Sequence, residues 1–116
     1  MHWQRTCIVI RGEVWWVEFD PAVGTEILKT RPAVIVSNDA ANRNLARVVV
    51  VPLTSSTGRQ YPGEALVSVD GQHNKAMADQ IMAADKARLK SRLGKLNKPD
   101  MQAVEDAIRL HLAMAK

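Results

Sequence analysis

Two continuous apolar runs constrain the fold more than any other feature of this sequence. Pro32–Ser37 reads PAVIVS and Arg47–Leu53 reads RVVVVPL, and both runs are rich in β-branched residues. Short runs without polar alternation are typical of strands that are buried on both faces. Pro32 is compatible with a strand because the first residue of a strand need not donate to the ladder. The two runs therefore predict the centre of a covered sheet.

Further strands are expected around these two runs. Glu13–Phe19 (EVWWVEF) has the β-branched and aromatic composition of a strand, and Glu64–Val69 (EALVSV) alternates, with its Ala and Val residues on one face. Shorter strands are predicted at Ala76–Met82 and Ser91–Leu96. Polar segments with Gly, Pro or Asn separate the strands as loops and turns, at 20–30, 38–46, 54–63 and 70–74.

The C-terminal segment has a helical pattern instead. Asn97 is a suitable N-cap, and Pro99 falls in the first turn, where its missing N–H is not needed. A single helical turn is also expected after Asn38 or Asp39. The helix after Asn97 presents apolar residues at helical spacing, namely Met101, Val104, Ile108 and Leu112. The sequence therefore predicts one mainly β domain with a C-terminal helix.

Composition limits the classes of protein that remain. The 116 residues are enough for one modest core, and 47% hydrophobic with 24% charged residues argues against disorder. No apolar run is long enough for a bilayer, and the single Cys7 excludes an internal disulfide or a Cys-rich metal site. A soluble cytoplasmic protein is expected. The net charge of +4 is compatible with a polyanionic partner without requiring one, and the basic stretch 86–98 is interpreted as a solvated face.

Five blocks of sequence, in order and spacing, resemble the MazF/PemK toxins. They read RGEVWWVEFDP, TRPAVIVSND, VVPLTS, ADQIMAADKARL, and GKL before the terminal helix. The resemblance runs from about Arg11 to Leu112, so residues 11–116 are expected to form one domain and residues 1–10 an extension of unclear role. The family implies an SH3-like, strongly twisted β-barrel of the MazF/PemK/CcdB type and a homodimer. It also implies sequence-specific, metal-independent cleavage of single-stranded RNA, without a cofactor, and neutralisation by a MazE-like antitoxin.

Arg31 and Thr54 are the candidate catalytic residues, and both match catalytic positions of the family. RNA carries its own nucleophile, so cleavage needs a positioned 2′-OH, proton transfer and stabilisation of phosphoryl charge, and leaves a 2′,3′-cyclic phosphate and a 5′-OH. Arg31 is expected at the end of the loop 20–30, where its guanidinium suits two phosphoryl oxygens. Thr54 ends a strand, and its hydroxyl both donates and accepts. Ser55 is a possible helper, and the general base is left open.

Other residues are candidates for RNA binding or support. Asp79 and Gln80 occupy the family's DQ motif, expected on a strand beside the site. PemK-like members carry an Arg two residues earlier, but this chain has Met77 there. Three roles therefore stay open for Asp79: it transfers a proton, it orients Arg31, or it only makes a hydrogen bond within the strand. Gln80 can read a base edge. Glu26 and Lys29, in the loop 20–30, are expected to border the RNA.

Two other readings of the sequence remain. A CcdB-like toxin has a related fold, binds DNA gyrase and has no nuclease activity. A plain SH3-like barrel would bind RNA or DNA in a salt-sensitive way without cutting it. The pair Arg31 and Thr54 favours the nuclease, because a gyrase-binding protein has no use for it.

Overall fold

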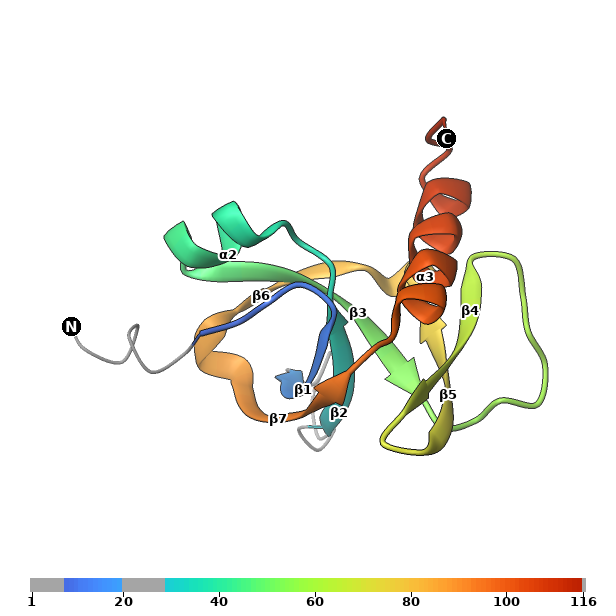
Figure 1. The fold of residues 1–116 in the computed structure, drawn as a ribbon, viewed down its shortest axis with the longest axis horizontal. Coiled ribbons are helices and arrows are strands. Elements are labelled where there is room, and N and C mark those ends of the chain that lie inside the picture. Colours follow the sequence, from blue (N-terminus) through green and yellow to red (C-terminus); the bar gives the residue numbers. More distant parts are fainter. Residues whose placement is uncertain (1–7, 20–28, 116) are drawn as a thin grey trace, which may run out of the picture.

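The computed structural model describes residues 8–19 and 29–115 of the chain. In this part of the molecule, strands dominate and two α-helices and two short 3-10 turns connect or follow them (Figure 1). In chain order the elements are β1 (Glu13–Phe19), β2 (Lys29–Ile35), α2 (Asp39–Asn44), β3 (Arg47–Thr54), β4 (Glu64–Val69), β5 (Gln72–Met77), η1 (Ala78–Gln80), β6 (Met82–Asp85), η2 (Lys86–Arg88), β7 (Leu89–Lys95) and α3 (Lys98–His111).

The strands form one sheet in the order β4-β5-β3-β2-β1-β7, with β6 paired to β3 beside this path. Val50 of β3 pairs with both Ile35 of β2 and Met82 of β6, so β2 and β6 lie on opposite edges of β3. β5 continues along the β6 edge, where Leu53 pairs with Ala76. The single strand β3 therefore joins both halves of the sheet.

The sheet curls on itself but does not close. Its terminal strands β4 and β7 approach each other, since a Cβ added at Gly94 would lie 3.5 Å from Cγ1 of Val69. Among the described residues, no ladder pairs β4 with β7. Two register shifts in the pairing of β1 with β7 are irregularities of the kind that bend and twist a sheet. The predicted class, mainly β with a C-terminal helix and an SH3-like twisted barrel, is confirmed, although the barrel is open.

The central strands bury both faces, as the two apolar runs predicted. Neighbouring residues of β2 and β3 alternate between two groups of buried side chains, which lie on opposite faces of these strands. Val34 and Val51, which pair with each other, belong to the group that also receives Val104 of α3. Ile35 and Val50 pair next to them and belong to the second group. This second group is completed by Val9, Val17, Ala33, Val48, Ala84 and Leu89.

Both helices begin where the sequence predicted. The side chain of Asn38 accepts a hydrogen bond from the Ala41 amide at 2.8 Å, and that of Asn97 accepts one from the Asp100 amide at 2.8 Å. α3 buries Val104 and packs against β4. Leu112 of the predicted stripe is 48% exposed, because α3 ends at His111. In the described part of the chain, no helix has the length and apolar character that a bilayer crossing requires.

The strand predicted at Ala76–Met82 is wrong. β5 ends at Met77, Ala78–Gln80 form the 3-10 turn η1, and β6 begins at Met82. The physical reason is a change of register along one edge of β3. Residue numbers of paired positions sum to 129 for Leu53 with Ala76 and to 132 for Val50 with Met82, so extra chain has to leave the ladder between β5 and β6.

Two other predicted boundaries shift. The turn expected at 70–74 is confined to Asp70 and Gly71, both at positive φ, and β5 begins at Gln72. β2 begins at Lys29, where it pairs with Phe19, so Lys29 and Arg31 are strand residues rather than loop residues. The cause is the length of β1, because pairing along all of β1 requires a partner strand that starts before Pro32.

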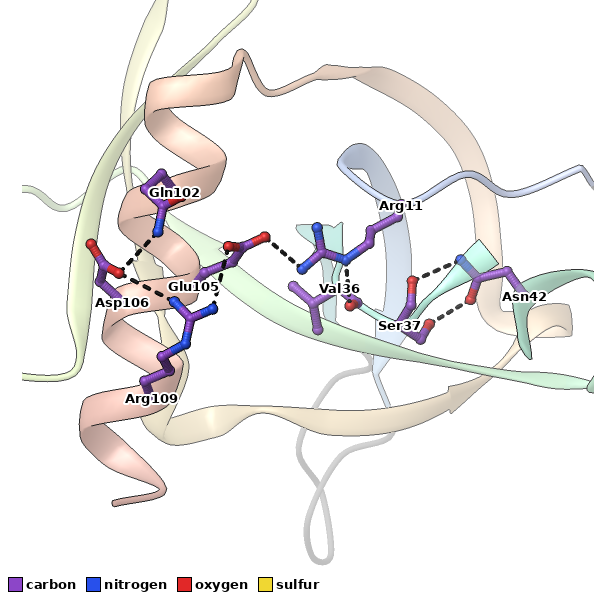
Figure 2. Close-up of polar contacts among 8 residues, drawn as sticks. All are labelled: Arg11, Val36, Ser37, Asn42, Gln102, Glu105, Asp106 and Arg109. Carbon is purple, nitrogen blue, oxygen red and sulfur yellow. Dashed lines mark hydrogen bonds and ion pairs between the residues drawn. The ribbon is translucent and has the colours of Figure 1, made fainter. Parts of the chain in front are cut away.

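Arg11 connects the start of the domain to two helices. Its amide donates to Asp39 Oδ1 at 2.8 Å, and its Nε donates to the Val36 carbonyl at 3.0 Å. Its guanidinium also reaches Glu105 of α3 at 2.9 Å, as Figure 2 shows. The hydrogen bond from the Arg11 amide is the main cause that lowers the pKa of Asp39 below its ordinary value of 3.8. Packing begins before Arg11, because Val9 is buried in the second group.

Candidate active site

Arg31 is the third residue of β2, and its backbone is fixed by pairing with Val17 of β1. Its side chain is half-buried. Within the described residues, no hydrogen bond or ion pair engages the guanidinium. The five donors of this group are therefore held on a strand and are not used by the neighbouring protein groups that the structure describes.

Thr54 is the last residue of β3, where the chain leaves the sheet. Its backbone pairs with Lys75 of β5, and its Oγ1 accepts a hydrogen bond from the Ser56 amide at 3.2 Å. The hydroxyl proton therefore stays available to a ligand. Ser55 follows in an exposed position at the start of the next loop. This geometry agrees with the expectation that Thr54 stands at a strand end.

The pairing register brings Arg31 and Thr54 to the same end of neighbouring strands. The last bonded pair between β2 and β3 is Ala33 with Pro52. Arg31 lies two residues before Ala33, and Thr54 lies two residues after Pro52, which is the same direction because the strands are antiparallel. Side chains two residues apart point to one face of a strand, and directly paired residues share a face. Arg31 and Thr54 therefore lie at the same end of the two strands and on the same face of the sheet.

Asp79 and Gln80 lie on the turn η1, at the edge of β3 that faces away from β2. Both residues are exposed, and Nε2 of Gln80 lies 3.4 Å from Sδ of the buried Met77. The described residues contain no ion pair or hydrogen bond between Asp79 and Arg31. Because η1 interrupts the strands that flank β3, it places a carboxylate and an amide beside the segment that leads to Thr54.

The two remaining predicted residues were expected in the loop 20–30. Glu26 lies outside the described residues. Lys29 is placed by its backbone at the start of β2, two residues before Arg31. In the described part of the chain, no three His, Cys, Asp or Glu side chains gather closely enough to hold a metal ion.

Sequence reasoning missed Lys75, which pairs with Thr54. It is only 8% exposed, although it is charged. Its ammonium lies 3.2 Å from Oε1 of Glu64 and donates to the Arg59 carbonyl at 2.5 Å. These contacts fasten the loop 55–63, which begins directly after Thr54. No signal in the segment QHNKAM distinguishes this lysine from an ordinary exposed strand residue, because its partners come from the other end of a loop.

Comparison with known proteins shows similarity over nearly the whole chain. The family model of the PemK-like, MazF-like toxins of type II toxin–antitoxin systems matches residues 10–112. Endoribonuclease MazF9 of Mycobacterium tuberculosis is 38% identical over 111 residues, which cover 88% of this chain and 94% of that protein. The endoribonuclease toxin MazF of Escherichia coli K12 is 31% identical over 100 residues, covering 85% of this chain and 89% of that protein.

Solved structures give the same result. An endoribonuclease from a mycobacterial species superposes with a TM-score of 0.79 at 28% identity, covering 94% of this chain and 95% of that one. A mycobacterial endoribonuclease in complex with its cognate antitoxin superposes with a TM-score of 0.76 at 30% identity, covering 92% of this chain and 97% of that one.

The fold is an open, curled sheet with a C-terminal helix, and the family model and solved structures match it along nearly its whole length. The chain is therefore a toxin of a type II toxin–antitoxin system. Within that class the chain belongs to the PemK-like, MazF-like family. The family predicted from the five sequence blocks is thus confirmed.

Proposed function

We propose that this chain is an endoribonuclease that cleaves single-stranded RNA at specific sequences without a metal ion. The observation that carries the proposal is the register of β2 and β3, which supports a joint site of Arg31 and Thr54. The similarity to proteins named endoribonucleases, over most of their length, supports the same reaction. A gyrase-binding toxin without nuclease activity is not favoured, because the matched relatives carry the nuclease name.

In this mechanism the RNA attacks itself. The 2′-oxygen bonds to phosphorus, the bond to the 5′-oxygen breaks, and one net proton moves from the first oxygen to the second. The products are a 2′,3′-cyclic phosphate and a 5′-OH, and no water or cofactor is consumed. The Arg31 guanidinium binds the non-bridging oxygens and stabilises the charge that develops on them. The Thr54 hydroxyl holds the attacking ribose in line.

The neighbouring residues would bind the RNA strand. Gln80 on η1 and Ser55 after Thr54 are exposed, and an amide or hydroxyl at these places can read a base edge or hold a phosphate. Asp79 lies next to Gln80 on η1 and would help to hold the RNA-binding groups in place. Lys29 and Glu26 precede Arg31 in the chain and are assigned to the border of the same groove.

The partners follow from the same proposal. A MazE-like antitoxin would neutralise the protein by blocking the RNA site. A related endoribonuclease has been solved in complex with its cognate antitoxin, which supports a partner of this kind. A homodimer would cover the exposed apolar side chains near the end of α3, because such patches are usually buried in interfaces. These side chains are Leu112 and Met114. The site of action is the cytoplasm, where the RNA is.

A cleavage assay tests the proposal. Purified protein is incubated with a long transcript in excess EDTA, and the fragment ends are mapped by primer extension and tested for cyclic phosphate. Cleavage at a defined sequence is expected, and Arg31→Ala protein serves as the matched control for contaminating nuclease. Intact RNA, or cleavage that persists in the Arg31→Ala protein, would contradict the proposal.

A further inference from the structure

The loop 55–63 is a preformed surface rather than a free connection. Lys75 binds the Arg59 carbonyl and the Glu64 carboxylate, as described above. The same carboxylate accepts a hydrogen bond from the Tyr61 amide at 2.7 Å, and Nε2 of Gln60 donates to the Glu64 carbonyl at 3.0 Å. Together with the buried Lys75 ammonium, these bonds hold the second half of the loop in place. A ligand that binds there therefore loses little free energy to ordering the loop.

Tyr61 is the aromatic residue that this frame presents. Its side chain lies under the guanidinium of Arg59, whose Cζ is 5.8 Å from the ring centroid, and Nζ of Lys75 lies 5.9 Å from the same centroid. Tyr61 nevertheless remains 53% exposed. Aromatic rings and guanidinium planes are the two kinds of side-chain group on which unpaired bases stack, so Tyr61 and Arg59 together form a platform of this kind.

A hollow lies next to this platform. It has a volume of about 540 Å³, within the range of small-ligand sites, and lies between the loop and α3. Tyr61, Leu66 and Leu110 provide its apolar lining, while Gln60, Glu64 and Asp106 bring polar groups to it. Two carboxylates make the hollow unsuitable for a phosphate. An uncharged, flat group with hydrogen-bonding edges fits both the platform and the hollow.

We propose that Tyr61 and Arg59 form a stacking subsite that takes up one unpaired nucleobase of the RNA next to the scissile bond. This inference rests on the proposed function, because it uses Thr54 as the place of cleavage. Lys75 pairs with Thr54, and its Nζ lies 5.9 Å from the Tyr61 ring centroid, so the ring is within reach of a base that neighbours a phosphate bound at Thr54. Lys75 is then a positioning residue that fastens both the platform and the strand end. Stacking on an aromatic ring is tolerant of sequence, so this subsite contributes affinity more than base identity.

An abasic scan tests the subsite. Short RNAs containing one cleavage sequence, each with one abasic nucleotide, are compared with wild-type protein and Tyr61→Leu protein. Removal of the base at one position that flanks the cleavage site should lower kcat/KM of the wild type about 10-fold, because stacking of a base on an aromatic residue contributes about 1–3 kcal/mol. In Tyr61→Leu protein, intact RNA should already show this loss, mainly in KM, and the same abasic change should add nothing.

Matched variants separate stacking from charge and folding. Tyr61→Phe keeps the ring and should retain the coupling to the abasic position. Arg59→Lys keeps the charge but loses the plane and should reduce the coupling, whereas Arg47→Lys at the opposite end of β3 should not. Lys75→Met should raise KM while cleavage of abasic RNA changes little. Loss spread evenly over all nucleotides, or wild-type kinetics in Tyr61→Leu, would overturn the subsite.

The same set of abasic RNAs can be used in binding titrations, which separate the stacking subsite from the nuclease proposal. RNAs with a 2′-deoxynucleotide at the cleavage position cannot react, so their dissociation constants report the stack alone. Coupling between Tyr61 and one base in these titrations supports the subsite even if no RNA is cut, in which case the nuclease proposal fails alone. Equal dissociation constants for intact and abasic RNA at every position overturn the subsite. Binding of an antitoxin peptide that depends on Tyr61, with no base coupling, would also overturn it.

Discussion

The guanidinium of Arg11 lies 2.9 Å from the carboxylate of Glu105, which joins the segment before β1 to the middle of α3 (Figure 2). The same side chain donates to the Val36 carbonyl directly after β2. One residue thus ties the first turn of the domain, the central sheet and the last helix. Because Arg109 reaches Glu105 only at 3.9 Å, Arg11 is the closer partner of this carboxylate.

Arg11→Met should therefore lower the free energy of unfolding by about 1 kcal/mol, because it removes a partly buried ion pair and a hydrogen bond to a carbonyl. Urea unfolding followed by Trp fluorescence measures the change. Arg109→Met is the matched control, since its contacts with Glu105 and Asp106 stay within one helix. A control that costs as much as Arg11→Met would contradict the role given to Arg11.

Asp39→Asn should remove a pH dependence of stability. The amide of Arg11 lowers the pKa of Asp39, so the folded state favours the ionised carboxylate. The stabilisation is present above the ordinary value of 3.8 and is lost as the pH falls through the lower pKa of the folded protein. Urea midpoints of the wild type and Asp39→Asn should differ at pH 7 and converge in acid, once the pH lies below the lowered pKa of Asp39. A difference that grows in acid would show the opposite sign.

The central strands could be predicted from sequence because burial on both faces requires a continuous run of apolar residues. The residues that reach the two cores are Ala33, Val34 and Ile35 in β2 and Val48, Val50, Val51 and Leu53 in β3, all within the two apolar runs. The turn η1 has no such local pattern. The segment AMADQIM reads as a strand, and what breaks it is the register of β5 and β6 on a third strand. Register is a property of the assembled sheet.

The face of α3 gives a stability prediction. Val104→Ala should cost about 2 kcal/mol, because Val104 is fully buried in the group beneath α3. Leu110→Ala removes a larger side chain that is 63% exposed, and it should change stability by less than about 0.5 kcal/mol. Thermal unfolding of both variants at equal concentration measures the contrast. If Leu110→Ala costs more than Val104→Ala, the exposed end of α3 is packed in solution.

The candidate site was only partly visible in the sequence. Arg31 and Thr54 stood out through the family resemblance, since a strand-end Thr and an Arg near a turn are ordinary by themselves. Their common place on one end of the sheet depends on the pair Ala33 and Pro52, which no local pattern predicts. Lys75 and Glu64 were missed for the same reason, because their contact closes a loop between two strands.

Arg31→Lys should retain the charge but lower kcat by at least about 100-fold, because an ammonium cannot bind two phosphoryl oxygens in one plane. The fold should be unaffected, since the backbone of Arg31 pairs with Val17 and its side chain holds no other described group. Single-turnover cleavage of one RNA measures the effect. Near-normal turnover would remove Arg31 from the mechanism.

Thr54→Val tests the hydroxyl with nearly the same shape, and Thr54→Ser is its matched control. The valine variant should lose about 10- to 100-fold in kcat/KM, whereas the serine variant keeps most of the activity, because only the first removes the donor and acceptor. Both should keep the backbone pairing with Lys75. Equal losses in the two variants would contradict a specific role of the hydroxyl.

Asp79→Asn decides between proton transfer and support. Asp79 stands exposed on η1 with Met77 buried behind it, so the cation that would make a PemK-like pair is replaced by a core side chain. A carboxylate without a paired cation has no fixed direction towards the ribose, and its loss should lower kcat/KM by less than about 10-fold without changing the shape of the pH–rate profile. Rates from pH 5 to pH 9 measure both quantities. If one limb of the profile disappears in Asp79→Asn, the carboxylate carries the proton.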